Sequence, residues 1–383
     1  MHSVSQFVFW TALTALLYVY AIYPLLVSVL SCFFPKHRPT PAYTPSVSML
    51  IAAYNEQINI RKKLEETLAV NYPVSKLEII VLSDGSTDQT DAIVESFHDR
   101  RVRLLRVKDR RGKTNAQNEG VKEARGEILV FSDATTVYHP LAIQYLACNY
   151  ADPQVGAVSG RYQYFDPVGD SPTGTGTMAF WNYENLIKMA QSRIRTISGC
   201  CGCIYSVRRN LYTPLSPDVI SDLVQPLHVI QQGHVVVFED RALAYEETTK
   251  SSTDEFAMRV RVVTRGIRGL LSVPNLLKPW NFPWVAFQLW SHKILRWLVP
   301  FFLLLLLGAN LFLTDRSIYR YSLFAQAGFY LLALLSLVIP FHRRWSVFGI
   351  PLYFCVLNAA AFISVIEVLR GRKYTVWQTV RRT

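Results

Sequence analysis

Three short polar segments follow apolar runs early in the chain, and they carry residues able to bind a ligand or a metal ion. They are Tyr54-Asn55-Glu56, Ser83-Asp84-Gly85-Ser86-Thr87-Asp88 and Ser132-Asp133-Ala134-Thr135. Each segment alone is weak evidence for a ligand site, because Asp-Gly is a common turn and Asp is a common helix cap. Ligands of open α/β sheets bind beyond the carboxyl ends of the strands, so three such segments in one unit predict a ligand site.

Asp133 is the strongest candidate metal ligand, because an Asp at a strand end offers hard oxygen atoms to a divalent cation. Mg²⁺ or Mn²⁺ typically takes one or two carboxylates and completes its shell with phosphate oxygens and water. Such an ion suits a diphosphate leaving group, since it neutralises the negative charge that develops on departure.

Gly112-Lys113-Thr114 matches the end of a phosphate-binding P-loop but not its spacing. The P-loop needs a Gly five residues before Gly112, and that position is Val107. Lys113 remains a candidate contact for a phosphate or a nucleotide. The alternative, without a binding role, is that the run from Arg100 to Lys113 is a solvated basic face.

Half of the six cysteines form one cluster, Cys200, Cys201 and Cys203. A zinc site would need a fourth soft ligand at a suitable spacing, and the local sequence offers none. We therefore expect small buried residues here. Nothing indicates a disulfide framework, which fits a reducing cytosol.

Apolar runs and amphipathic segments alternate between about Pro41 and Val260. The runs predict strands at 47–52, 77–82, 102–107 and 128–131, and the amphipathic segments predict helices at 57–70 and 87–97. This alternation predicts an α/β fold, a doubly wound and mainly parallel sheet whose strand ends gather the polar segments.

Composition separates this middle region from the two ends of the chain. Of the 383 residues, 50% are hydrophobic and only 18% are charged, against about 25% charged in typical soluble domains. These values exclude a disordered, collagen-like or small disulfide-rich protein.

The segment from Phe7 to Phe34 has no charged residue and is long enough to span a bilayer. We interpret it as a retained anchor with a cytoplasmic exit at Lys36-His37-Arg38, the alternative being a cleaved signal peptide.

Three further apolar stretches predict membrane helices near the C-terminus, at Trp297 to Leu313, Leu323 to Pro340 and Val347 to Ile366. Their number raises a parity problem. If the middle domain is cytoplasmic, three crossings leave the basic tail outside, whereas the positive-inside rule places it inside. Either one segment is re-entrant or interfacial, or the rule fails here.

The stretch from Trp280 to Trp290 is rich in aromatic residues and is flanked by basic ones. Aromatic and basic residues together at a bilayer edge predict interfacial amphipathic helices, with an ordinary core helix pair as the alternative. The net charge of +12 fits anionic lipid or an anionic substrate. No zinc-finger or RNA-binding signature accompanies it, so we expect no nucleic-acid partner.

Four ordered motifs resemble those of family 2 glycosyltransferases, in the membrane-bound branch that includes polysaccharide synthases. They are Ile51-Ala52-Ala53-Tyr54-Asn55-Glu56, Ser83-Asp84-Gly85-Ser86-Thr87-Asp88, Gly112-Lys113-Thr114-Asn115-Ala116 and Phe131-Ser132-Asp133-Ala134. Further matches follow at Ser198-Gly199, Ser221-Asp222 and Ser291-His292-Lys293. The resemblance covers nearly the whole chain. It implies a GT-A fold, a nucleotide-diphosphate sugar donor and inversion at the anomeric carbon.

The resemblance also implies roles for single residues. It assigns donor binding to six positions, Ala53, Asn55, Glu56, Asp84, Lys113 and Asp133. Among these, Asp84 would hydrogen-bond the base and Asp133 would begin the Asp-x-Asp metal motif. Gly199 and Arg261 would contact the acceptor or the diphosphate.

Two departures from the family pattern bear on this expectation. The second position of the metal motif is Thr135, whose hydroxyl is a weaker ligand than a carboxylate. The counterpart of the Gln-x-x-Arg-Trp motif of processive synthases is Met258-Arg259-Val260-Arg261-Val262, which keeps only Arg261. The missing aromatic residue weakens the argument for processive polymer extrusion.

Inverting transfer needs a base that removes the proton of the acceptor hydroxyl as it attacks the anomeric carbon. In the family, a carboxylate before an apolar helix does this. Asp222 in Ile220-Ser221-Asp222-Leu223 occupies that place, with Asp218 as runner-up. The alternative is that Asp222 merely caps the following helix.

The expected organisation is an anchor at 1–38, a catalytic domain at 41–258, interfacial helices at 259–296 and membrane helices with a basic tail at 297–383. We expect an integral protein of the bacterial inner membrane with a cytoplasmic catalytic domain. It would transfer a sugar, from a UDP-sugar donor, to a lipid-linked or saccharide acceptor, in contact with membrane lipids and with a membrane subunit as a further candidate partner. The alternatives are a processive, product-extruding synthase and a noncatalytic transporter or scaffold.

Overall fold

The computed structural model describes residues 2–35, 39–40, 42–166, 169, 171–339 and 345–376. The predicted basic segment Lys36-His37-Arg38 and the end of the basic tail lie outside the described residues.

One eight-stranded sheet organises the middle of the chain, in the order β3-β2-β1-β4-β7-β6-β8-β5. The strands are β1 (Val47–Ala53), β2 (Leu77–Ser83), β3 (Val102–Arg106), β4 (Ile128–Asp133), β5 (Val137–Tyr138), β6 (Val155–Phe165), β7 (Ile204–Arg208) and β8 (Val235–Glu247). β1 pairs in parallel with β2 and β4, as do β2 with β3 and β6 with β8. β7 runs antiparallel to β4 and β6. The predicted mainly parallel α/β sheet is confirmed.

Helices cover both faces of the sheet, which explains why its strands are nearly continuous apolar runs. On one face, α3 (Ile60–Leu68), α4 (Thr90–Glu95) and α6 (Ala142–Ala147) pack against alternate residues of β1 such as Met49 and Ile51. On the other face, α5 (Lys113–Glu123) and α8 (Ser221–Gln231) pack with Leu50. The strand ends are thereby held rigidly at one edge.

Four helices within the described residues are long and apolar enough to cross a membrane. The first combines α1 (His2–Leu17), a π-helical turn at Tyr18–Ile22 and α2 (Tyr23–Ser31). The second runs without a break from α10 (Pro283–Gln288) through Leu289–Ile294 into α11 (Leu295–Leu311), so the aromatic stretch belongs to it from Pro283 onward, while Trp280 and Phe282 precede it. The third and fourth are α12 (Ser317–Val338) and α13 (Gly349–Leu369). The predicted N-terminal anchor and C-terminal helices are confirmed as membrane-capable elements.

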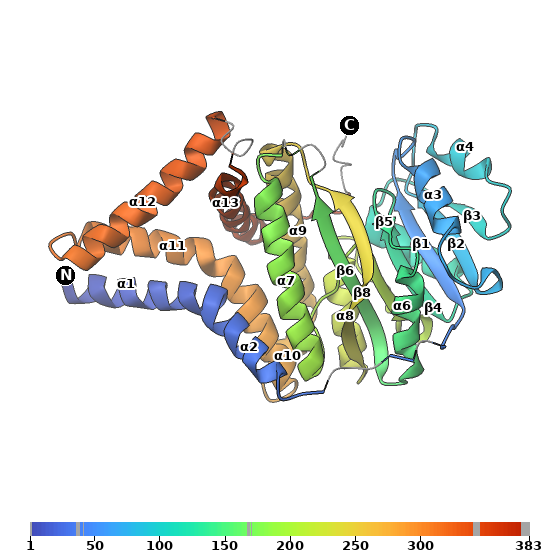
Figure 1. Ribbon diagram of the computed structural model, residues 1–383, viewed down its shortest axis with the longest axis horizontal. Coiled ribbons are helices and arrows are strands. Elements are labelled where there is room, and N and C mark those ends of the chain that lie inside the picture. Colours follow the sequence, from blue (N-terminus) through green and yellow to red (C-terminus); the bar gives the residue numbers. More distant parts are fainter. Residues whose placement is uncertain are drawn as a thin grey trace.

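The helix α13 is placed differently from the others. α1, α11 and α12 project away from the sheet, whereas α13 lies beside α9 (Ser252–Ser272) and α7 (Gly174–Ile194), the helices that border the sheet domain (Figure 1). Ser364 donates a hydrogen bond to the Val260 carbonyl at 3.0 Å, and Arg259 donates to the Tyr353 hydroxyl at 2.9 Å. Of its most apolar window, 44% is buried, against 11% for α12.

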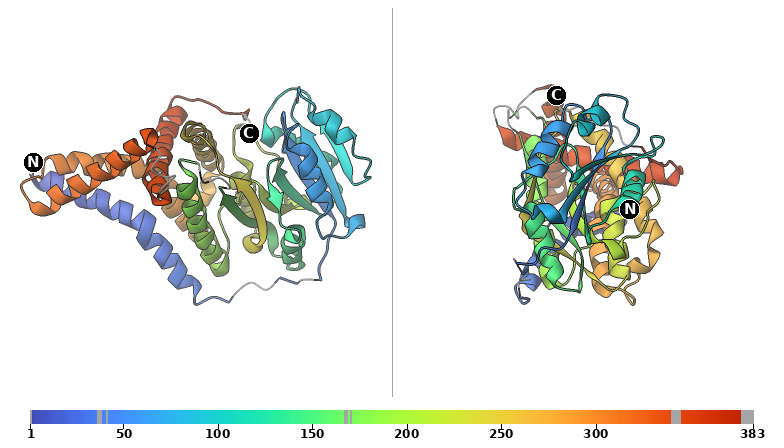
Figure 2. Two further views of the ribbon diagram at one scale, coloured as in Figure 1. Left: turned by 45° about the horizontal axis from the view of Figure 1, so that its top comes forward. Right: turned by 90° about the vertical axis from the view of Figure 1, so that its right-hand side faces the viewer.

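The start of α1 lies at the outer end of the membrane-capable helices (Figure 1). His2 lies 3.7 Å from Asp315 in the α11–α12 connection, far from the sheet. The chain after α13 instead returns to the sheet domain (Figure 2). Arg268 of α9 donates to the Arg372 carbonyl at 2.9 Å, and the Thr375 carbonyl lies so close to Gly112 that a Cβ there would meet it at 1.9 Å. The segment 372–376 therefore lies on the same side as the strand ends.

Candidate active site

The loops after β1 and β2 are tied together by side-chain hydrogen bonds. Asn55, with a φ of 52°, accepts from the Thr87 backbone N–H at 2.8 Å and donates its own N–H to the Ser86 hydroxyl at 3.2 Å. The Glu56 N–H donates to the Thr90 hydroxyl at 2.8 Å, and the Glu56 side chain is buried. These bonds fix the edge of the sheet at which polar segments meet.

Asp84 is fully buried behind this edge. Its two carboxylate oxygens accept the backbone N–H groups of Arg111 at 3.0 Å and Gly112 at 2.9 Å. Burial raises the pKa of Asp84, and these two N–H groups oppose the rise. Asp84 thus holds the loop before α5 in place, and this loop presents Lys113.

Lys113 and Asp133 form an ion pair at the carboxyl end of β4. The Lys113 ammonium also donates to the Gly202 carbonyl at 3.2 Å. Burial lowers the pKa of Lys113, but the Asp133 carboxylate more than reverses this, so the pKa is raised overall. Lys113 is therefore a fixed positive charge beside the predicted metal ligand.

Thr135 faces a carboxylate that sequence reasoning missed. Its hydroxyl donates to Glu246 of β8 at 2.8 Å. Burial, together with the charge of Asp133, raises the pKa of Glu246 to about 8. Since Glu246 is 111 positions away from Thr135, no local pattern in the sequence links the two.

Asp222 lies in the first turn of α8, but the N-cap position belongs to Ile220. Its carboxylate packs against Gly202, where a Cβ would approach within 2.9 Å of Oδ2. Burial raises the pKa of Asp222, and the positive charges of Lys113 and Lys188 lower it in part. A half-buried carboxylate whose pKa is raised is well placed to accept a proton.

The runner-up base, Asp218, lies elsewhere. It accepts a hydrogen bond from the Ser216 hydroxyl and lies 3.8 Å from Arg268. It does not line the cavity that Asp222 lines. The geometry therefore favours Asp222.

A cavity of about 550 Å³ joins most of the predicted site residues. Its wall includes seven of them, Glu56, Lys113, Asp133, Thr135, Gly199, Asp222 and Arg261. The other three lie outside its lining: Ala53 ends strand β1, and Asn55 and Asp84 belong to the supporting loops. Arg261 comes from α9, and burial lowers its pKa while Asp133 opposes that shift. Among these seven residues, the cavity thus brings two cations and three carboxylates to one space.

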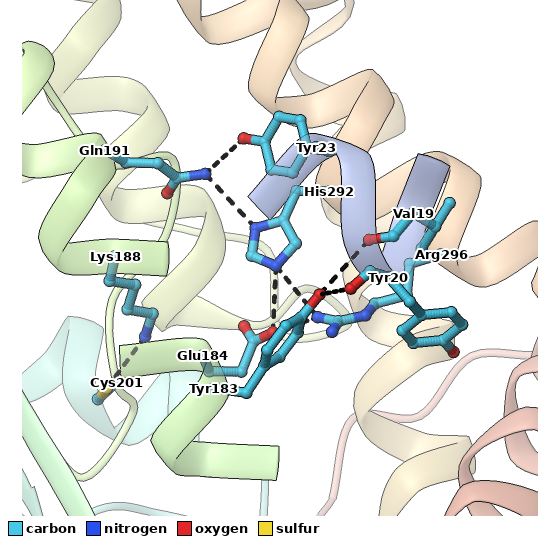
Figure 3. Close-up of polar contacts among 10 residues, drawn as sticks. All are labelled: Val19, Tyr20, Tyr23, Tyr183, Glu184, Lys188, Gln191, Cys201, His292 and Arg296. Atoms are coloured by element: carbon cyan, nitrogen blue, oxygen red, sulfur yellow. Dashed lines mark hydrogen bonds and ion pairs between the residues drawn. The ribbon is translucent and has the colours of Figure 1, made fainter. Parts of the chain in front are cut away.

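The same cavity extends to the membrane helices, where it meets a second polar cluster that sequence reasoning largely missed (Figure 3). Glu184 of α7 pairs with Arg296 and lies 3.1 Å from His292 Nε2. Gln191 of α7 donates to the Tyr23 hydroxyl at 2.7 Å. Burial raises the pKa of Glu184, but Arg296 and His292 lower it further, so it lies well below its usual range. The cluster therefore holds a charged carboxylate inside the protein.

Comparisons with known proteins show what the sheet domain is similar to. Residues 48–214 match the family model described as glycosyl transferase family 2. A probable glycosyltransferase of Bacillus subtilis, YdaM, is 29% identical over 231 residues, covering 56% of this chain and 53% of that protein. The poly-beta-1,6-N-acetyl-D-glucosamine synthase of Staphylococcus epidermidis is 31% identical over 202 residues, covering 46% of this chain and 47% of the synthase. The chain thus spans about half the length of these curated relatives.

One solved structure extends the likeness to the membrane helices. The mannosyltransferase PcManGT of Pyrobaculum calidifontis, in complex with GDP-Man and Mn²⁺, matches with a TM-score of 0.73. The match covers 97% of this chain and 99% of that one at 22% sequence identity. At this identity the match establishes a shared fold.

Proposed function

We propose that this chain, whose residues 48–214 match the family 2 glycosyl transferase model and whose fold matches that of a mannosyltransferase, transfers a sugar, with inversion, from a nucleotide-diphosphate donor to an acceptor at a membrane. The observation that carries the proposal is the single cavity in which Lys113, Asp133 and Asp222 meet and which continues to the membrane helices. Donor and acceptor can therefore approach one another from its two ends.

Asp222 is the proposed general base. It would take the proton of the acceptor hydroxyl while the hydroxyl oxygen bonds to the anomeric carbon. The bond between that carbon and the diphosphate oxygen breaks, and the nucleoside diphosphate leaves with the electron pair. The burial that raises the pKa of Asp222 makes it a stronger base than a solvated Asp.

A divalent ion fits the donor end only if the substrate supplies some of its ligands. Among the described residues, no group of three His, Cys, Asp or Glu side chains is arranged to hold a metal. Asp133 supplies one carboxylate, with Glu246 near it. Mg²⁺ or Mn²⁺ would complete its shell with diphosphate oxygens and water, and when bound it would neutralise the leaving group. The Mn²⁺ in the mannosyltransferase complex supports this assignment.

We place the sheet domain in the cytoplasm of a bacterium, with the inner membrane crossed by three helical segments, α1–α2, α10–α11 and α12. In this arrangement α13 lies at the membrane surface against α7 and α9, and the segment 372–376 stays with the sheet domain. The parity problem then disappears, because an even number of C-terminal crossings leaves the basic tail on the cytoplasmic side.

A processive synthase is the second candidate. The relatives named poly-beta-1,6-N-acetyl-D-glucosamine synthase support it, and so do the aromatic residues Trp181, Phe180 and Tyr353 in the cavity wall. Val262 counts against it, because this position lacks the Trp of processive enzymes.

The test uses the purified full chain in lipid nanodiscs with Mn²⁺ or Mg²⁺ and radiolabelled nucleotide sugars. The panel includes UDP-N-acetylglucosamine as the proposed kind of donor and GDP-mannose as its competitor. We expect release of nucleoside diphosphate and a labelled, lipid-soluble product of one or a few sugars. A long polymer would favour the processive candidate, and no turnover with any donor would refute both.

A further inference from the structure

The membrane-side half of the cavity holds more positive than negative charge. Three cationic side chains, Lys188, Lys293 and Arg296, line it together with one carboxylate, Glu184. Two of the cations come from one membrane-capable helix, Pro283–Leu311, and Lys188 comes from α7. Buried charges are costly unless they are paired, so the imbalance points to an anion that enters the cavity.

Arg296 is already paired and fixed. It forms the ion pair with Glu184, and its guanidinium lies 5.2 Å from the ring centre of Phe180 and 5.5 Å from that of Tyr183. The one carboxylate of the cluster is therefore used by Arg296 and by His292.

Lys188 and Lys293 have no carboxylate within ion-pair distance in the described part of the structure, although Glu184 and Asp222 act on them electrostatically from farther away. Lys188 is buried and donates to the Cys201 sulfur at 3.0 Å, which is a weak acceptor. Lys293 lines the cavity, and among the described residues it has no hydrogen bond or ion pair. Two ammonium groups thus remain available to one ligand.

The position of Lys188 and Lys293 relative to Asp222, the proposed base, indicates which ligand they would bind. Asp222 interacts electrostatically with Lys113 toward the donor and with Lys188 and Lys293 toward the membrane. The donor diphosphate already has Lys113 and Arg261 at its end. An anion at Lys188 and Lys293 would lie on the other side of Asp222, where the acceptor must come.

The part of the cavity wall that α13 supplies is mainly apolar, with Ile350, Phe354, Leu357 and Ala361 beside Tyr353 and Asn358. A ligand that uses this whole half therefore has an anionic head followed by an apolar body. A neutral saccharide chain would leave the two ammonium groups unpaired.

We propose that Lys188 and Lys293 bind the phosphate headgroup of an amphiphilic acceptor whose apolar part lies along α13. That this ligand is the acceptor rests on the proposed function, but its binding can be tested without a sugar donor.

The test measures binding of radiolabelled dodecyl phosphate to the full chain in nanodiscs of zwitterionic lipid, with dodecanol and inorganic phosphate as comparison ligands. We expect dodecyl phosphate to bind, dodecanol to bind more weakly, and Lys293→Ala to weaken dodecyl phosphate roughly tenfold or more. Lys278→Ala is the matched control, because Lys278 is an exposed lysine near the same helix and outside the cavity. It should change binding less than about twofold.

Further arms separate the alternatives. Lys293→Arg should retain binding, and Lys188→Met should weaken it, while unchanged thermal unfolding shows that each variant is folded. Equal binding of phosphate and alcohol, or an unaltered Lys293→Ala variant, would overturn the proposal. Binding of a labelled glucosamine oligosaccharide in place of dodecyl phosphate would also overturn it and would indicate a polymer channel. Binding of inorganic phosphate as tight as that of dodecyl phosphate would place a free anion here. Absence of sugar transfer with intact binding would refute only the proposed function.

Discussion

The donor end and the membrane end of the cavity acquire their charged residues in different ways. At the donor end, Asp133 ends strand β4 and Lys113 begins helix α5, and their side chains form an ion pair. At the membrane end, Glu184 on α7 meets Arg296 and His292, which come from another helix more than 100 positions later. The donor end is thus built by one sheet edge, and the membrane end by helix packing. We expect substitutions at the donor end to affect chemistry and those at the membrane end to affect stability or acceptor binding.

The strongest test of this comparison is Asp222→Asn. The substitution keeps the shape of the side chain and removes the proposed base, so the turnover number should fall roughly 10³-fold. Single-turnover transfer of labelled sugar measures it. Asp218→Asn is the control, since Asp218 lies outside the cavity, and it should keep nearly full activity. Equal losses of activity in both variants would show that Asp222 is not the general base.

Glu184→Gln tests the membrane end. It leaves Arg296 buried without its carboxylate, so we expect a loss of roughly 3 kcal/mol in stability. Thermal unfolding in nanodiscs measures this as a lower midpoint. The control is Glu119→Gln, which removes an exposed pair with Lys122 and should change the midpoint little. A stable but inactive Glu184→Gln protein would move this residue into the chemistry and break the comparison.

Asp133→Ala tests the donor end without touching the base. It removes the proposed protein ligand of the divalent ion, so activity should fall roughly 100-fold, or about 2.7 kcal/mol in activation free energy. Chelation with EDTA should then abolish activity of the natural chain but change the variant little. If both proteins respond equally to EDTA, the ion is bound elsewhere.

The pH dependence sharpens the role of Asp222. Because burial raises its pKa, the ionised base is lost at a higher pH than for a solvated Asp as the medium is acidified. Activity should therefore decline on the acid side of neutrality and be flat above it. The slope of log kcat against pH measures this, and Asp222→Asn should lose the acid limb while it keeps its low residual rate.

The smallest expected effect concerns the segment after α13. Arg268→Ala removes the hydrogen bond to the Arg372 carbonyl, which should cost about 1 kcal/mol and raise the donor KM a few-fold, because residues 372–376 lie against Gly112 beside Lys113. Arg316→Ala, in the distant α11–α12 connection, is the control. A larger change in acceptor KM than in donor KM would place this segment at the wrong end of the cavity.

The sequence by itself determined the elements and the donor-end motifs. Buried strands must be apolar and must end where the chain becomes polar, so strands near 47–52, 77–82 and 128–131 could be predicted within a few residues. The same rule located Asp84 and Asp133, and the length of uncharged runs located the membrane helices.

Only the tertiary structure decided how distant elements meet. Glu246 contacts Thr135 and Glu184 contacts Arg296 although each pair is more than 100 positions apart in the sequence. No local sequence pattern predicts either contact. The apolar composition of α13 is equally compatible with lipid and with packing against α7 and α9, so its place could not be deduced from hydropathy. Local sequence specifies which surface each element buries, but the partner that covers this surface is selected by packing of the whole chain.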